Sequence, residues 1–136
     1  MYLVDTDVLI EARKGECANT GVRSFFQRAK EDDVPLFLSA ITIGELRQGV
    51  ETIRLRGDGL QAERLERWLE RITIEYSESI LALDAEIAQI WGRLRVPENP
   101  LDKQIAATAL IYGLTVATRN TAHYSATGVQ LLNPFT

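Results

Sequence analysis

The chain has 136 residues, 46% of them hydrophobic, and a formal net charge of −4. This length suits one compact domain, which we expect to span residues 1–136. The negative charge argues against a protein that holds nucleic acid through an overall positive potential, but leaves open a nuclease whose phosphates meet bound cations.

The cysteine and histidine counts exclude several kinds of site. Cys17 is the only cysteine, so no internal disulfide can form, which fits a reducing compartment. His123 is the only histidine, which excludes zinc sites built on several histidines and makes a Ser-His-Asp triad improbable. The sequence shows no signal peptide and no apolar run long enough to span a bilayer, so we expect no membrane partner and a cytoplasmic protein.

The first part of the chain alternates strand and helix patterns. The predicted elements, in chain order, are a strand at 2–5, a helix at 8–12, a helix at 22–29, a strand at 36–39 and a helix at 42–53. Asp7 is expected to cap the first helix, and Pro35 to keep the second from continuing.

The second part continues this alternation. The predicted elements are a helix at 65–72, a strand at 72–76, a helix at 80–94, a loop at 97–100, a helix at 101–110, and strands at 114–117 and 129–132. Glu and Arg residues alternate on the polar side of the helix at 65–72, and the simplest interpretation is a solvated face. Strands alternating with helices predict a three-layer α/β fold, with a parallel sheet flanked by helices.

Four polar side chains are expected at one edge of this sheet. Ligand sites in open α/β sheets lie beyond the carboxyl ends of the strands. Asp5 ends the first strand, Asn120 follows the strand at 114–117, and Glu45 and Asp102 begin helices next to strands. The sequence therefore predicts that these groups converge from distant positions.

Each acidic residue also has a purely structural interpretation. Thr42 and Glu45 have the spacing of a capping box, and Asp102 suits the positive end of a helix dipole. Asp5 could likewise cap a helix, but a carboxylate after an apolar strand should be partly buried, where an unpaired charge is costly. Clustered carboxylates repel one another unless a cation lies between them, and oxygen ligands favour Mg²⁺ or Mn²⁺.

Five segments together resemble one known family. They are Leu3-Val-Asp-Thr-Asp-Val-Leu-Ile10, Leu38-Ser-Ala-Ile-Thr-Ile-Gly-Glu-Leu-Arg-Gln-Gly49, Leu101-Asp-Lys-Gln-Ile-Ala-Ala-Thr-Ala109, Val116-Ala-Thr-Arg-Asn120 and Thr127-Gly-Val-Gln-Leu-Leu-Asn-Pro134. In this order and spacing the chain resembles the PIN-domain ribonucleases, specifically the VapC or FitB-like toxins of bacterial toxin–antitoxin pairs. Each segment alone is a weak signal, but together they run from one end of the chain to the other.

The resemblance implies a set of site residues. Asp5, Glu45 and Asp102 match three members of an acidic quartet that holds Mg²⁺ or Mn²⁺, and Thr6 matches the hydroxyl beside the first member. Asn120 stands at the fourth position. Relatives with Asn there often have Asp three residues later, where this chain has His123. This departure leaves open whether one or two metal ions bind, and for His123 we favour a surface or packing role.

The resemblance also implies a mechanism. Asp5 and Asp102 would hold a metal ion that activates a water molecule for attack on phosphorus, and Glu45 would position that water. Thr6 would orient Asp5 or the water, and Asn120 would hydrogen-bond a water ligand.

Arg119 has two interpretations of equal weight. It would contact a phosphate directly, or its charge would offset the acidic cluster. The partners implied by the resemblance are an RNA substrate, a cognate antitoxin and a second copy in a homodimer. Which RNA is cleaved and which surface forms the dimer are not readable from the residues.

Two other functions are weighed against this one. A haloacid-dehalogenase-type phosphatase also begins with a strand and Asp-x-Asp, and would use Asp5 as a nucleophile. The shortness of the chain and the lack of a late pair of Asp residues disfavour it. A catalytically silent PIN-like module that only binds RNA or protein would fit Asn120 and His123, but not three retained acidic positions.

Overall fold

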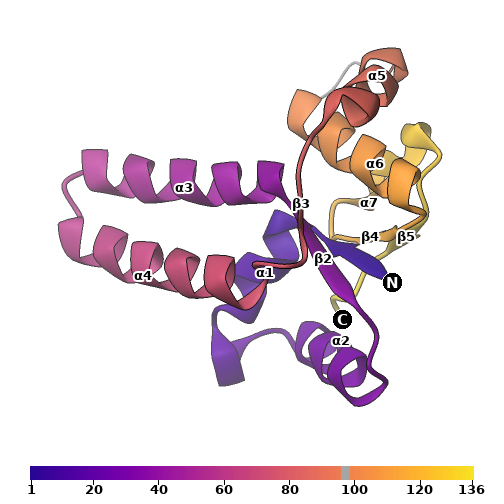
Figure 1. The fold of residues 1–136 in the computed structure, drawn as a ribbon. Helices are drawn as coiled ribbons and strands as arrows, with labels where there is room; N and C mark the ends of the chain where they lie inside the picture. Colours follow the sequence, from indigo (N-terminus) through magenta and orange to yellow (C-terminus); the bar gives the residue numbers. More distant parts are fainter. Residues whose placement is uncertain (96–98) are drawn as a thin grey trace.

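The computed structural model describes residues 1–95 and 99–136 and contains a five-stranded parallel sheet in the order β3-β2-β1-β4-β5 (Figure 1). The strands are β1 (Tyr2–Val4), β2 (Leu36–Ser39), β3 (Ile80–Leu81), β4 (Thr115–Ala117) and β5 (Leu131–Leu132). All four neighbouring pairs are parallel. The predicted α/β fold with a parallel sheet is confirmed.

Helices connect and flank these strands. They are α1 (Thr6–Ala12), α2 (Thr20–Glu31), α3 (Ala40–Leu55), α4 (Gly59–Glu75), α5 (Ala85–Arg93), α6 (Pro100–Tyr112) and α7 (Thr121–Tyr124). Two short 3₁₀ turns follow α1 and α7, at Gly15–Cys17 and Ser125–Thr127.

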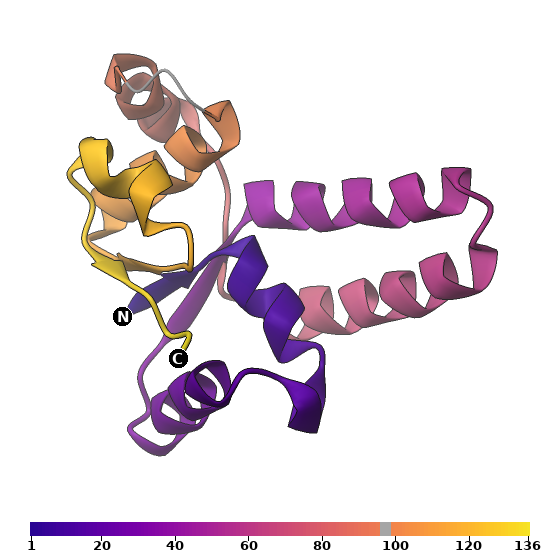
Figure 2. The same cartoon turned by 180° about the vertical axis from the view of Figure 1, so that it is seen from behind.

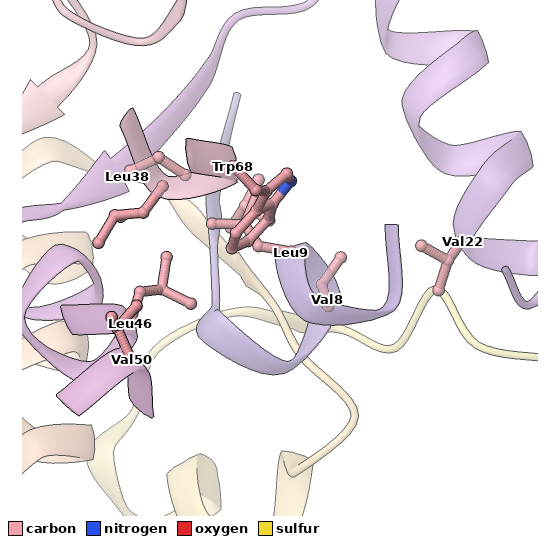
Figure 3. Packing of buried hydrophobic residues seen from close by; sticks show 9 residues of the cluster. Val8, Leu9, Val22, Leu38, Leu46, Val50 and Trp68 are labelled. Atoms are coloured by element: carbon pink, nitrogen blue, oxygen red, sulfur yellow. The ribbon is translucent and has the colours of Figure 1, made fainter. Parts of the chain in front are cut away.

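Alternating strand residues supply two hydrophobic clusters. Val4 of β1 and Leu38 of β2 pack with side chains of α1, α2, α3 and α4. Leu3 and Phe37, the residues next to them, pack with side chains of α6, β4 and α7. Successive side chains of a strand point to opposite faces, so the sheet lies between two helical layers. Figure 3 shows the first cluster, in which Trp68 of α4 lies near α1.

The helices α3 and α4 form a long hairpin that extends away from the sheet (Figures 1 and 2). Their facing surfaces carry an ion-pair network in which Glu66 of α4 binds Arg47 at 2.6 Å and Arg54 at 3.1 Å. Where α3 starts, the hairpin meets the carboxyl end of β2, and this junction carries Glu45 into the sheet edge.

The strand predicted at 72–76 is wrong, because α4 continues through Glu75 and the third strand lies at Ile80–Leu81. The alternation of Ile72, Ile74 and Tyr76 was misleading. Ile72 and Tyr76 are one helical turn apart and pack on the core, whereas Ile74 is 75% exposed. In a half-buried strand, all three side chains would point to the same face. In the helix, Ile74 instead points to solvent.

Three predicted helix starts also differ from the structure. Asp5, not Asp7, is the N-cap of α1. Ser39 caps α3, so the helix begins at Ala40 rather than near position 42. Asp84 caps α5 through the N–H of Ile87, which moves that helix start from 80 to 85. Of the predicted loop at 97–100, residues 97 and 98 lie outside the described residues, Asn99 is the N-cap of α6, and Pro100 already belongs to that helix.

Candidate active site

The order of the strands places a ligand site at the end of β1. This strand has β2 on one side and β4 on the other, so connections leave it in opposite directions. Open α/β sheets bind ligands at such a switch point. Asp5 follows β1 directly, and its Oδ1 accepts the N–H of Thr6 at 2.8 Å. Capping α1 therefore fixes Asp5 at the centre of the sheet edge.

Asp5 is buried, with only 5% of its surface exposed. Its Oδ2 accepts the hydroxyl groups of Thr118 at 2.9 Å and Tyr124 at 3.0 Å. Burial, and after it the charge of Asp7, raise the pKa of Asp5 to about 6, although hydrogen bonds to the carboxylate oppose the rise. The surroundings therefore disfavour the negative charge of Asp5, and a bound cation would offset this.

Glu45 joins this site from α3. The hydroxyl of Thr6 donates to its Oε1 at 2.9 Å, so Thr6 orients Glu45 rather than Asp5. Burial raises the pKa of Glu45, and the nearby charge of Asp102 acts in the same direction. Because α3 starts at Ala40, Glu45 lies inside the helix, and the capping-box interpretation of this residue is wrong.

Asp102 enters from the first turn of α6, whose N-cap is Asn99. Its Oδ1 lies 3.4 Å from the hydroxyl oxygen of Tyr124, and its Oδ2 lies 3.2 Å from Nδ1 of His123. The His123 side chain is half exposed, but it contacts a site carboxylate. The predicted surface position of His123 is confirmed, and the residue also lies at the rim of the site.

The sequence analysis missed two hydroxyl groups that organise these carboxylates. Tyr124 is fully buried in α7, and its hydroxyl contacts both Asp5 and Asp102. Thr118 contacts Asp5 directly. Thr118 follows β4 immediately, so the rule that selected Asn120 could have selected it too. No sequence signal indicated Tyr124, because α7 was not predicted.

Asp7 also faces the site, although the sequence analysis treated it only as a cap. Its Oδ2 accepts the backbone N–H of Arg119 at 2.8 Å, and the hydroxyl of Thr118 lies 3.5 Å away. Burial raises the pKa of Asp7, while the bond to the Arg119 N–H and the Arg119 charge lower it. The Asp-Thr-Asp sequence could have indicated this role for Asp7, because all three residues after β1 line the site.

Arg119 and Asn120 lie where β4 ends. The guanidinium carbon of Arg119 lies 3.9 Å from the ring centroid of Phe135, so the side chain packs on the carboxyl-terminal segment. Its charge still lowers the pKa of Asp7, which supports the charge-offsetting interpretation; a phosphate contact stays a prediction. Asn120 donates its backbone N–H to Thr118 at 3.0 Å.

The acidic side chains described above line one hollow of about 240 Å³. Its lining residues are Asp5, Thr6, Asp7, Ile10, Glu45, Asn99, Asp102, Asn120 and His123. The residues predicted for catalysis and metal binding, apart from Arg119, are thus brought together. In the described ranges, however, no three acidic, histidine or cysteine side chains stand close enough to hold a metal ion as they lie.

Comparison with known proteins identifies the family. The sequence model of the PIN domain matches residues 2–129. The chain belongs to the PIN domain family. It is 35% identical to Toxin FitB of Neisseria gonorrhoeae, over 99% of both chains, and 32% identical to VapC ribonuclease Y4jK of Sinorhizobium fredii, over 99% of this chain and 98% of the relative. The crystal structure of FitAcB from Neisseria gonorrhoeae matches with a TM-score of 0.82 at 32% identity, over 98% of each chain.

Membership of the PIN family accounts for the three-layer fold and leaves the phosphatase alternative without support. In the part of the chain that the structure describes, no helix has the length and hydropathy needed to cross a membrane.

The donor set of this PIN site fits a divalent cation. Carboxylate oxygens of Asp5, Glu45 and Asp102 line one hollow, and hard oxygen ligands suit Mg²⁺ or Mn²⁺. Burial raises the pKa of Asp5 and Glu45, so a positive charge in the hollow would stabilise their ionised forms. Each of these carboxylates contacts a hydroxyl group: Thr6 contacts Glu45, and Tyr124 contacts both Asp5 and Asp102.

Proposed function

We propose that this chain is a Mg²⁺- or Mn²⁺-dependent endoribonuclease that acts in the cytoplasm as the toxin of a toxin–antitoxin pair. The observation that carries this proposal is the convergence of Asp5, Glu45 and Asp102, from three separate elements, on one hollow at the switch point of the sheet. The names of the relatives, Toxin FitB and VapC ribonuclease, support the same activity.

Each site residue has a defined task in this proposal. Asp5 and Asp102 would hold the metal ion, which would supply an activated water and neutralise charge on the phosphoryl oxygens. Glu45, whose Oε1 accepts the Thr6 hydroxyl, would position that water or share in removing its proton.

The neighbouring residues position these groups. The amide of Asn120 lines the hollow and orients a water molecule there. The Tyr124 hydroxyl links Asp5 to Asp102, and the Arg119 charge offsets the acidic cluster. When a phosphate enters, Arg119 leaves Phe135 and contacts it, since a guanidinium group binds phosphate oxygens in pairs.

The proposed partners are a cognate antitoxin and a second copy of the chain. The structural neighbours include "Structure of FitAB bound to IR36 DNA fragment", at a TM-score of 0.81 and 29% identity. An antitoxin arginine inserted into the hollow would inhibit the enzyme by pairing with its carboxylates. Leu55 and Leu60, exposed by 88% and 61% at the tip of the α3–α4 hairpin, offer apolar surface for a homodimer.

The test is cleavage of a mixed RNA pool by the purified protein. Mg²⁺ or Mn²⁺ should support cleavage, EDTA should stop it, and Asp5→Asn should abolish it while circular dichroism shows an unchanged fold. Cleavage that persists in EDTA would contradict the metal-dependent mechanism. RNA binding without cleavage under all metal conditions would favour the silent-module alternative.

A further inference from the structure

Four arginines gather around one hollow outside the acidic site. Arg13 follows α1, while Arg64, Arg67 and Arg71 belong to α4, and together with Trp68 they line a hollow of about 350 Å³. The spacing of three and four residues places the α4 arginines on one side of the helix. The Arg13 guanidinium lies 5.9 Å from the Trp68 ring centroid, which anchors the fourth arginine beside the other three.

None of these four arginines pairs with a carboxylate at ion-pair distance within residues 1–95 and 99–136, whereas Arg47 of α3 does. Four positive charges are therefore concentrated at one place on a chain whose net charge is −4. Such a cluster is unfavourable by itself and attracts anions. The alternating Glu and Arg residues predicted a solvated face. In the structure, the arginines of this face line the hollow and the glutamates do not.

The lining points to phosphate rather than to a protein segment. Trp68 is only 8% exposed, so the accessible groups of the hollow are guanidinium groups. Guanidinium groups bind phosphate oxygens through two parallel hydrogen bonds. The adjacent hollow shares Arg13 and Trp68 and adds apolar residues such as Leu9 and Ile72, so binding of a protein segment is the outcome that the experiment must separate from RNA binding.

The cluster lies one short helix away from the acidic site. The helix α1 runs from Thr6 to Ala12, between its N-cap Asp5 and Arg13, and its seven residues rise about 10 Å. A nucleic-acid strand spans this distance with a few nucleotides. The same strand can therefore reach both places.

We propose that Arg13, Arg64, Arg67 and Arg71 form a second phosphate-binding site, which holds the backbone of the RNA substrate a few nucleotides from the bond that the acidic site cleaves. This inference rests on the proposed ribonuclease function. The site recognises the phosphate backbone and adds affinity without base specificity.

The experiment measures binding of a fluorescein-labelled single-stranded RNA by anisotropy in EDTA, where no cleavage occurs. The variant Arg64→Ala/Arg67→Ala/Arg71→Ala should weaken binding at least about tenfold, and the slope of log K against log salt should fall by about 2, or about 0.7 for each lost phosphate contact. With metal present, KM for a long RNA should rise while kcat stays unchanged.

The matched control is Arg47→Ala/Arg54→Ala, which removes arginines of the same hairpin that already pair with Glu66. This variant should change RNA affinity by no more than about twofold. Circular dichroism should show all variants folded, because the five substituted arginines are exposed.

Equal affinity and equal salt slope for the triple variant and the wild type would overturn the inference. So would a triple variant that keeps RNA affinity but loses binding of a protein partner, which would assign the cluster to that partner. Arginine-dependent RNA binding by a wild-type protein that never cleaves RNA would instead overturn the proposed function and leave the phosphate site standing.

Discussion

Asp5 has two tasks, because the same carboxylate caps α1 and faces the hollow. A carboxyl group whose pKa is raised by folding favours the folded state in its protonated form. That contribution is complete below the ordinary pKa of 3.8 and is lost as the pH rises through about 6. Near neutral pH and without metal, Asp5 is therefore a source of instability.

We predict that Asp5→Asn stabilises the metal-free protein at pH 7.5. A pKa shift from 3.8 to about 6 corresponds to at most about 3 kcal/mol in the free energy of unfolding. Asn is also a good helix cap, so α1 keeps its start. Urea unfolding in EDTA measures the free energy of unfolding of the variant and of the wild type. The difference between the two should be smaller at pH 5 than at pH 7.5. A difference that does not change with pH would contradict the role assigned to burial.

Tyr124→Phe tests the link between Asp5 and Asp102. The ring stays in its buried place while both hydroxyl contacts are lost. Partners that orient metal ligands commonly contribute a factor of ten or more to affinity, so we expect the Kd for Mn²⁺ to rise about tenfold. Calorimetric titration measures this. The control is Tyr112→Phe, which changes a 47% exposed tyrosine and should leave the Kd unaltered.

Most of the site was predictable at the residue scale, and the reason is topological. Asp5, Glu45, Asp102 and Asn120 lie next to strand ends or helix starts, and a parallel sheet gathers such positions at one edge. The contacts of Tyr124 were not predictable, because they depend on a four-residue helix without a clear sequence pattern. Side-chain hydrogen bonds between distant residues have no signature in a single sequence.

At the scale of elements, the carboxyl-terminal segment is held against α2. The Asn19 side chain donates to the carbonyl of Thr136 at 3.0 Å and accepts its N–H at 3.1 Å, and it also caps α2. Phe135 of the same segment lies under Arg119. The segment therefore connects the start of α2 with the rim of the active site.

Gly21→Ala should break this connection. A Cβ atom at Gly21 would lie 2.2 Å from the carbonyl oxygen of Pro134, so the backbone of the segment must move. Overpacking of this kind costs about 1–3 kcal/mol, and thermal unfolding should show a lower midpoint.

The matched control for this substitution is Gly49→Ala inside α3, where a Cβ meets nothing within 4 Å. Alanine is the better helix former, so this variant should gain about 0.5–1 kcal/mol in the free energy of unfolding. A stabilised Gly21→Ala would show that the segment is not docked on α2.

Long helices were predicted more accurately than short strands. The patterns for α2, α3 and α6 were long and clearly periodic, and these helices occur within a few residues of their predicted bounds. The strand β3 has only two residues, too few for any period, so an alternating stretch of α4 was mistaken for it. The N-cap residues Ser39 and Asp84 set the starts of α3 and α5. Several neighbouring residues could also have capped these helices, so the sequence did not indicate which one does.

For the whole molecule, metal binding and stability are linked. A ligand that binds only the folded state stabilises it by about 2.7 kcal/mol at a concentration one hundred times its Kd. Mn²⁺ should therefore raise the unfolding midpoint of the wild type, and EDTA should reverse the rise. Asp5→Asn should show a much smaller response in the same thermal scans. An equal response in both proteins would place the ion elsewhere.

The parallel sheet and its covering layers followed from the alternation of strands and helices, but the strand order did not. Only the structure shows that β1 is central, with β2 and β3 on one side and β4 and β5 on the other. Strand order depends on which neighbours bury the most apolar surface together. No single segment carries that information.

The central place of β1 has a consequence for synthesis on the ribosome. This strand emerges long before one of its two neighbours, β4, which is encoded more than a hundred residues later, at Thr115–Ala117. Until that late strand arrives, one edge of β1 has no partner, and Asp5 lacks its contacts with Thr118 and Tyr124. A growing chain thus cannot assemble the hollow around Asp5 until β4 and α7 have both left the ribosome.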